Sequence, residues 1–272
     1  MKELNILAVG AHPDDCDFCF GGTALKFKAR GCKVRFVSIT DGCSGHHLNP
    51  GPEMAKRRLA EMEAVSRLTG IEYKTLGVPD GFLTAELKYR DLLMAEIRMF
   101  NPYIIFTHRT NDYHPDHRAA GTLVMDCSYL LIVPFVVPTV PPMKNAPYIF
   151  NFADRFSFPA PFEPDIAVCI DDVTDGKTGI LDCHISQVYE WLPYAGGYAE
   201  GIPPENEPEK RKSWLKSQLF GRNSAISEKY RNVLVRRYGE EKGNSIKECE
   251  AFQLCEYGAQ ADIEELDGLF PV

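Results

Sequence analysis

Two apolar segments that each end in a turn rich in histidine and aspartate constrain this chain more than any other feature. Residues 4–10 run directly into the first turn, Ala11-His12-Pro13-Asp14-Asp15. Residues 102–108 precede the second turn, His114-Pro115-Asp116-His117. In open α/β sheets the carboxyl ends of parallel strands lie at one edge, where such folds build their sites. The two turns are therefore expected to meet, although they lie far apart in the sequence.

Imidazole and carboxylate groups converging in this way favour a metal site. His12 and Asp15 are three residues apart and can face the same ion from one tight turn. Two imidazoles and one carboxylate with an open position fit a catalytic Zn²⁺ or a non-haem Fe²⁺. The simpler alternative is that each His-Pro-Asp is only a turn in which the aspartate caps a helix. Two turns of the same chemistry, both at predicted strand ends, favour the metal.

The first half of the sequence alternates between strand and helix patterns. Strands are predicted over 4–10, 33–40, 73–78 and 102–108, each followed by a polar loop. Gly21-Gly22 is expected to interrupt the first helix, which continues over 23–30. Further helices are predicted over 52–68, 86–100 and 115–127. This alternation predicts an α/β fold, a Rossmann-like doubly wound and mostly parallel sheet with helices on both faces.

The second half is less regular. The proline-rich segment 134–164 is expected to be extended or irregular, with edge strands. A strand over 165–170 and a helix over 176–191 follow. Residues 192–208 are expected to form a loop, and 209–238 a helical region broken near Gly221, before a mixed apolar tail from 251. Because no boundary is evident, we expect a single domain over 1–272, with a core of about 1–190 and a C-terminal extension of about 191–272.

Charge and length exclude several classes of protein. The 272 residues carry a formal net charge of −8, which argues against a nucleic-acid surface. No apolar segment is long enough for a transmembrane helix. Met1–Glu3 lead into the first strand without a signal-peptide pattern, which predicts a cytoplasmic protein. The nine scattered cysteines are expected to be reduced, since the Cys16-x-x-Cys19 pair lacks the second pair that a zinc or redox site needs.

Taken together, the two turns resemble the LmbE / PIG-L family of metal-dependent N-deacetylases. The resemblance covers about residues 4–190. It extends to four weaker motifs: Thr40-Asp41-Gly42, Arg58-x-x-Glu61, Pro79-Asp80-Gly81 and His184-x-Ser-Gln187. One departure is Cys16, which stands where the family often has glutamate after the aspartate pair.

The resemblance implies a role for each residue of the two turns. It implies a Zn²⁺ ion, with Fe²⁺ or another divalent metal left open, bound by His12, Asp15 and His117. Asp14 would be the general base. His114, oriented by Asp116, would stabilise the oxyanion. The spacing alone does not decide which of His114 and His117 binds the metal.

The substrate implied by the resemblance contains an N-acetylglucosamine unit. Arg58 and Asp80 match positions expected to bind sugar hydroxyls, and His184 matches a position near the site. Each has a structural alternative: Arg58 an ion pair with Glu61, Asp80 a turn, and His184 a packed helix. The other residues near strand ends are expected to be structural or to support the site: His46, His47, His108 and Asp41.

The sequence therefore predicts a zinc-dependent hydrolase that removes acetyl from an N-acetylated amino sugar or glycoconjugate through metal-activated water. One alternative is an amidase of the same fold acting on another amide, such as a thiol conjugate. Another is a non-catalytic metal- or sugar-binding module, which would have no need of Asp14. A dinucleotide-binding oxidoreductase is disfavoured because the first turn lacks G-x-G-x-x-G. The expected partner is a small-molecule N-acetyl sugar or glycoconjugate, and a homo-oligomer remains open.

Overall fold

Seven strands form one mixed sheet in the order β3-β2-β1-β4-β5-β7-β6 in the computed structural model, which describes residues 4–272. Met1–Glu3, where the sequence lacks a signal-peptide pattern, lie outside the described residues. The first four strands pair in parallel, as predicted. They are β1 (Asn5–Gly10), β2 (Lys33–Thr40), β3 (Glu72–Val78) and β4 (Ile104–Thr107). Since β1 pairs directly with β4, the two turns that follow them begin side by side.

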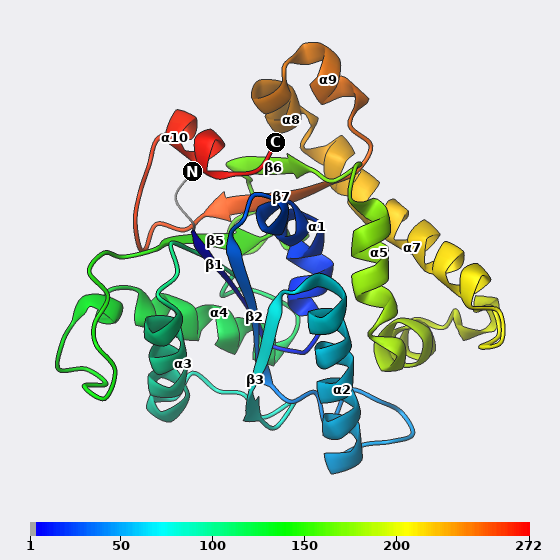
Figure 1. Ribbon diagram of the computed structural model, residues 1–272, viewed down its shortest axis with the longest axis horizontal. Coiled ribbons are helices and arrows are strands. Elements are labelled where there is room, and N and C mark those ends of the chain that lie inside the picture. The colour runs from blue at the N-terminus through cyan, green and yellow to red at the C-terminus, as the bar shows by residue number, and fades with distance from the viewer. Residues whose placement is uncertain (1–3) are drawn as a thin grey trace.

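Helices cover both faces of this sheet, which confirms the predicted architecture (Figure 1). α1 (Asp15–Ala29) and α2 (Pro52–Thr69) lie on one face, and α3 (Leu87–Phe100) and α4 (Pro115–Ser128) lie on the other. Each face has its own buried core, one including Phe20 and Phe106 and the other Ile97 and Leu123. On α2, Leu59 and Leu68 are exposed, so two residues of its apolar pattern face away from the core.

The predicted interruption of the first helix at Gly21-Gly22 is wrong, because α1 runs through both glycines. A Cβ atom on Gly22 would lie 2.8 Å from Cγ2 of Ile170, so the glycine permits a close approach between elements. The Glu250 carboxylate also accepts hydrogen bonds from the backbone N–H groups of Gly22 (2.9 Å) and Thr23 (2.7 Å). These glycines therefore mark a packing contact within the helix.

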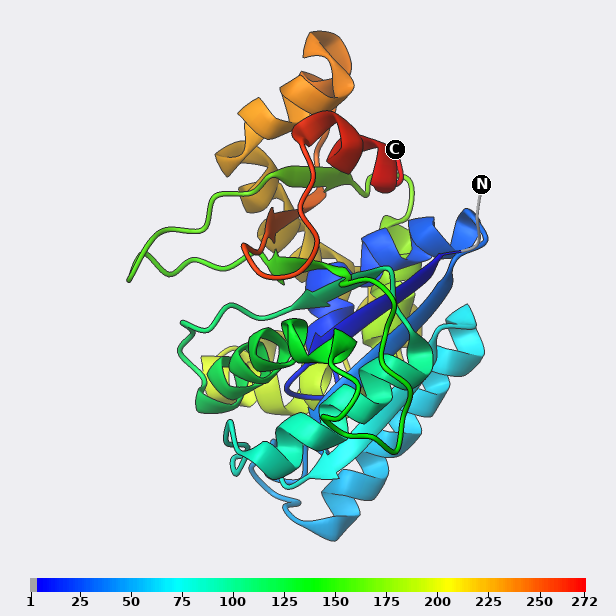
Figure 2. The same cartoon turned by 90° about the vertical axis from the view of Figure 1, so that its left-hand side faces the viewer.

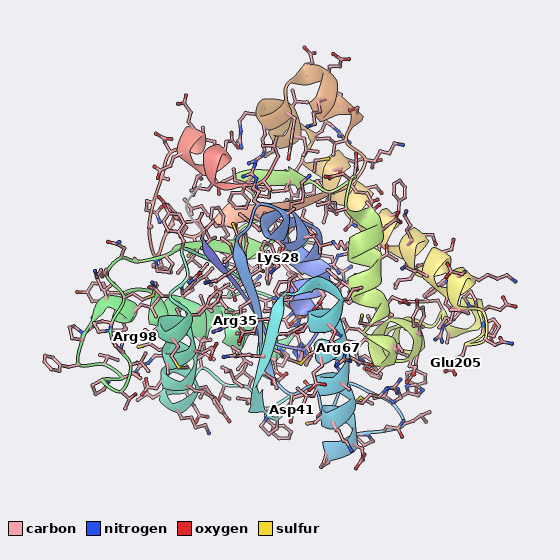
Figure 3. All side chains as sticks on the ribbon, viewed as in Figure 1. Lys28, Arg35, Asp41, Arg67, Arg98 and Glu205 are labelled. Carbon is pink, nitrogen blue, oxygen red and sulfur yellow. The ribbon has the colours of Figure 1, made fainter. Side chains whose placement is uncertain are left out.

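The proline-rich segment contains an interior strand where edge strands were expected. β5 (Tyr148–Phe152) lies between β4 and β7. Before it, the chain wraps around the buried guanidinium of Arg98, which Figure 3 places on α3. That guanidinium donates hydrogen bonds to six backbone carbonyls, three just before the segment and three within it: Leu130, Leu131, Val133, Val136, Val137 and Val140. Backbone carbonyls outside helices and strands need hydrogen-bond donors when they are buried, and the Arg98 side chain supplies donors for all six.

The region expected to be a C-terminal extension supplies a strand to the sheet. β7 (Cys249–Leu254) lies antiparallel between β5 and β6 (Ile166–Cys169). Figure 2 shows the orange-red β7 passing alongside the green strands of the same sheet. The remaining helices of this region are α8 (Arg231–Tyr238), α9 (Glu240–Ser245) and α10 (Ile263–Leu269).

Three helix boundaries in the second half also differ from prediction. The helix expected over 176–191 is two segments, α5 (Thr174–Asp182) and a π-helical turn over Ser186–Trp191. The expected loop begins with α6 (Leu192–Gly196) and contains a 3₁₀ turn over Ala199–Gly201. α7 (Pro208–Lys229) continues through Gly221, where a break was predicted, and Tyr230 caps its carboxyl end. Across residues 4–272, no helix combines the length and apolar character needed to cross a membrane.

Candidate active site

The two histidine-aspartate turns meet at the carboxyl ends of β1 and β4, where their residues line a cavity of about 940 Å³. His12 lies in the loop before α1, and Asp15 is the first residue of that helix. His114 caps the amino end of α4, and His117 lies in its first turn. The ring centroids of His12 and His117 are 5.1 Å apart. The predicted convergence of the two turns is thus present.

Three of these side chains have the spacing of metal ligands. His12 Nδ1 lies 3.2 Å from His117 Nε2 and 3.5 Å from Asp15 Oδ2. His117 Nε2 lies 3.3 Å from Asp15 Oδ1. A tetrahedral ion with ligand bonds of about 2.0–2.1 Å holds its ligand atoms roughly 3.3 Å apart. Because the two contacts of Asp15 are made by different carboxylate oxygens, His12, Asp15 and His117 can bind one ion once the Asp15 carboxylate turns a single oxygen toward both histidines.

The charge of this cluster also favours a cation. Five aspartates gather around the histidines: Asp14, Asp15, Asp80, Asp112 and Asp116. Among the described residues, Arg58 is the one arginine that forms an ion pair with any of them. Burial opposes protonation of His12, but the neighbouring carboxylates of Asp116, Asp15 and Asp80 raise its pKa well above the usual range. Burial likewise opposes protonation of His117, yet the Asp15 carboxylate brings its pKa to about 9. The site therefore attracts positive charge, which a divalent ion can supply in place of protons.

Carboxylates outside the ligand triad orient its two imidazoles. Asp112 Oδ1 lies 3.0 Å from His117 Nδ1, which leaves Nε2 free to face the ion. Asp80 and Asp116 flank His12 Nε2 at 3.2 and 3.4 Å, yet neither makes a well-aligned hydrogen bond with it. Such carboxylate–histidine pairs fix the ring orientation of metal ligands. Sequence reasoning missed Asp112, whose signal was a carboxylate five residues before His117 in the same loop.

Three sets of residues in the described chain each offer three ligand atoms that lie within 4.8 Å of one another. They are His12/His114/His117, Asp15/His108/His117 and His12/Asp80/Asp116. His12, Asp15 and His117 each belong to at least one of these sets, but the three are not together in any of them. His108, expected to be structural, is buried with its Nε2 3.0 Å from Asp15 Oδ2. Since His114 remains within reach, the geometry leaves open the choice between His114 and His117 that the spacing left open.

Asp14 is the carboxylate next to the triad that faces an arginine. Its Oδ1 lies 3.3 Å from Arg58 Nη2, and Arg58 also pairs with Glu61 (3.0 Å) and donates to the Pro13 carbonyl. Burial raises the pKa of Asp14, and the Arg58 charge opposes that rise. Arg58 is only 1% exposed, yet it is among the residues that line the cavity. Its contacts suit an anchor for Asp14, and its predicted role in binding a sugar hydroxyl stays a prediction.

His114 is oriented by backbone rather than by the carboxylate that the sequence suggested. The Asp116 N–H donates to His114 Nδ1 at 3.2 Å, so neutral His114 carries its proton on Nε2. Burial lowers the pKa of His114, and the charges of His12 and His117 lower it further. The Asp116 carboxylate instead accepts the Gly81 N–H (2.7 Å) and lies beside His12. His114 is thus a neutral hydrogen-bond donor facing the cluster.

The remaining predicted residues divide between the cavity and the interior. Asp80 lines the cavity. The Asp41 carboxylate stabilises the loop that carries Asp80 by accepting a hydrogen bond from the Asp80 N–H at 3.2 Å. In Figure 3, Asp41 lies at the ends of β2 and β3. His184 is fully buried with Nε2 3.3 Å from Asp17 Oδ1, and it is not among the described residues lining the cavity. Its neighbour Gln187 does line the cavity.

Comparison with known proteins gives concordant matches. The family model "PIG-L: GlcNAc-PI de-N-acetylase" matches residues 7–128. A diacetylchitobiose deacetylase from Thermococcus kodakarensis is 28% identical over 205 residues, covering 70% of this chain and 74% of that protein.

Solved structures share the fold along nearly the whole chain. The N,N'-diacetylchitobiose deacetylase from Pyrococcus horikoshii has a TM-score of 0.69 at 23% identity, covering 93% of this chain and 84% of that one. GalB, a 4-carboxy-2-hydroxymuconate hydratase from Pseudomonas putida KT2440, has a TM-score of 0.71 at 17% identity, covering 95% of this chain and 99% of that one. Since these two proteins are named for different reactions, the fold alone does not determine the chemistry.

Proposed function

We propose that the protein is a metal-dependent hydrolase acting on N-acetylated amino sugars or glycoconjugates of the N-acetylglucosamine type, since residues 7–128 match the PIG-L family model. It removes the acetyl group by hydrolysis of the amide. The observation that carries the proposal is Asp14, a buried carboxylate held by Arg58 directly beside a ligand triad. A module that only binds metal or sugar has no use for this second carboxylate.

We propose that His12, Asp15 and His117 hold the metal, and that zinc is the ion. Two imidazoles and one carboxylate are a frequent ligand set of catalytic zinc. When bound, the ion activates water and polarises the amide carbonyl. Asp112 holds the His117 ring, and Asp80 and Asp116 crowd His12 Nε2, so both ligands are oriented in advance.

Asp14 moves the proton in this mechanism. It takes a proton from the attacking water and returns it to the nitrogen of the amine when the C–N bond breaks. Acetate and the free amine are the products. Arg58 is a positioning residue, because its guanidinium is held by Glu61 and the Pro13 carbonyl and fixes the Asp14 carboxylate without taking part in proton transfer.

His114 stabilises the negative oxygen that develops on the amide carbon. It acts as a neutral imidazole that donates from Nε2, because its Nδ1 accepts the Asp116 N–H. Asp80 remains the candidate contact for a sugar hydroxyl on the cavity wall. We also propose a cytoplasmic location, since all nine cysteines are free and free thiols are typical of reducing compartments.

Acetate release from N-acetylglucosamine and its glycosides by zinc-loaded protein tests this function. Asp15→Asn is expected to lose both bound metal, measured by elemental analysis, and activity. Asp154→Asn is the matched control, because Asp154 lines the same cavity but pairs with Arg109 at 3.3 Å outside the metal cluster. Equal acetate release by Asp15→Asn and the unmodified protein would refute the assignment.

A further inference from the structure

The cavity extends well beyond the metal cluster, along one face of α7. Five residues of this helix that line it recur at helical spacing and are here named the α7 stripe: Trp214, Gln218, Arg222, Ala225 and Lys229. At about 1.5 Å per residue the stripe is roughly 22 Å long. This wall is several times the width of one sugar ring, so the cavity accommodates a substrate longer than a monosaccharide. Figure 1 shows α7 as the long yellow helix beside α5.

The amino end of the stripe is aromatic. The Trp214 ring lies 6.3 Å from Tyr198 and 6.0 Å from Tyr189, measured between centroids. Trp191 and Tyr198 also line the cavity. Flat aromatic faces of this kind bind the faces of rings. Both tryptophans of the chain lie in this cavity, which makes their fluorescence a direct reporter of binding.

The middle and carboxyl end of the stripe are cationic. The Arg222 guanidinium lies 5.3 Å from the Phe18 ring, and Phe18 follows Asp15 on α1, so Arg222 is beside the catalytic turn. Arg222 and Lys229 are both exposed, and neither forms an ion pair with any residue of the described chain. By contrast, Arg109 in the same cavity is neutralised by Asp154.

Two other cations of α7 are paired with carboxylates. Lys210 pairs with Glu207 at 2.7 Å, and Lys216 pairs with Asp175 at 2.5 Å. Arg222 instead donates to Cys19 Sγ (3.4 Å), and Lys229 lies over the Tyr230 ring (4.9 Å). Within the described chain no carboxylate neutralises the two cations that line the cavity, so both charges are available to an anionic ligand.

We propose that Arg222 and Lys229 form a subsite for an anionic group, a carboxylate or a phosphate, which the substrate carries beyond its N-acetyl sugar. The substrate class is then an acidic N-acetylated glycoconjugate, and Trp214 stacks on a further ring of it. The inference rests on the proposed function for the sugar end of the substrate. Charge-assisted contacts of arginine and lysine with such anions are short and strong.

Two aryl glycosides that differ by one charge test the subsite. The 4-carboxyphenyl N-acetylglucosaminide is expected to have a kcat/KM about tenfold above that of the phenyl glycoside at low salt, mainly through KM. In Arg222→Gln/Lys229→Gln the ratio falls to about one. In Lys210→Gln/Lys212→Gln, a matched loss of two charges on the same helix outside the cavity lining, the ratio stays near ten. N-Acetylglucosamine 1-phosphate against methyl N-acetylglucosaminide distinguishes a phosphate from a carboxylate preference.

Tryptophan fluorescence separates this proposal from the proposed function. Titration with the two aryl glycosides reports binding even where no acetate is released. A tighter Kd for the carboxyphenyl glycoside, lost only in Arg222→Gln/Lys229→Gln, supports the subsite whatever the reaction. Equal Kd values for both glycosides, or the same loss in Lys210→Gln/Lys212→Gln, overturn it. Trp214→Ala is expected to weaken both aryl glycosides about fivefold and to leave N-acetylglucosamine unchanged, and an unchanged Kd for them would remove the stacking role.

Discussion

Two buried polar clusters in this molecule differ in how completely their groups are paired. In the cluster around Lys177, the ammonium contacts Glu250 (2.7 Å) and Asn223 (3.2 Å), and Asn223 donates to Glu248 (2.9 Å). The Glu250 carboxylate also accepts two N–H groups of α1. In the cluster around the proposed metal ligands, His12 Nε2 and Asp116 Oδ1 are buried without hydrogen-bond partners.

This difference separates a cluster that holds the fold from one that holds a ligand. The Lys177 cluster joins α1, α5, α7 and β7, and every charge in it has an opposite charge or a donor. The ligand cluster carries more carboxylates than arginines and so retains affinity for a cation. Loss of a partner is therefore expected to affect stability in the first cluster and activity in the second.

The largest effect is expected from Asp14→Asn. The amide cannot accept a proton from water, so kcat should fall by about 10³-fold. Metal content should be unchanged, since Asp14 is outside the ligand triad. Glu250→Gln, the same chemical change in the Lys177 cluster, is the control and should leave kcat intact while lowering stability. Both kcat values are corrected for the folded fraction. If Glu250→Gln then loses as much kcat as Asp14→Asn, the Lys177 cluster is not merely structural and the contrast between the clusters is wrong.

Next in size is the effect of Lys177→Met on stability. The change leaves Glu250, which is 2% exposed, as a buried charge without its ammonium partner. The free energy of unfolding should fall by about 3–5 kcal/mol, measured by urea denaturation. Activity per folded molecule should persist. Lys177→Arg keeps the charge and should lose less, which provides a readout if Lys177→Met does not fold. A loss under about 1 kcal/mol in Lys177→Met would mean that the pair contributes little.

Removal of the metal should destabilise the protein by a smaller amount. An ion that binds only the folded state, at a free concentration 100 times its Kd, adds about 2.7 kcal/mol. Chelation should therefore lower the Tm of the zinc-loaded protein, and Asp15→Asn should show no such shift. Lys177→Arg should show the full shift, because its altered cluster does not touch the metal. A chelator effect that persists in Asp15→Asn would place the ion elsewhere.

The same contrast explains how much the sequence could predict. The ligand cluster comes from two short motifs at strand ends, so local spacing and the parallel β1–β4 pairing were enough to bring His12, Asp15 and His117 together. Asp112 was missed because its role depends on the conformation of a loop. Lys177 and Glu250 come from distant elements with no local signal. Similarly, Gly22 was misread as a helix break because the contact that requires it, with Ile170, lies far along the chain.

The smallest effect is expected at Glu190. Its ionic contacts are only partly buried, unlike those of either cluster. Glu190 contacts His46 (2.9 Å) and Arg57 (2.7 Å). Burial alone would raise the pKa of Glu190, but hydrogen bonds from Arg57 and His46 hold it below the usual range. A carboxylate with a depressed folded pKa adds stability above its unfolded pKa of about 4.3, and this is lost as the pH falls through the folded value. Glu190→Gln should therefore cost about 1 kcal/mol at pH 7 and progressively less below about pH 4.5. If urea denaturation gives the same difference at pH 7 and pH 4, the contribution of Glu190 is packing rather than charge.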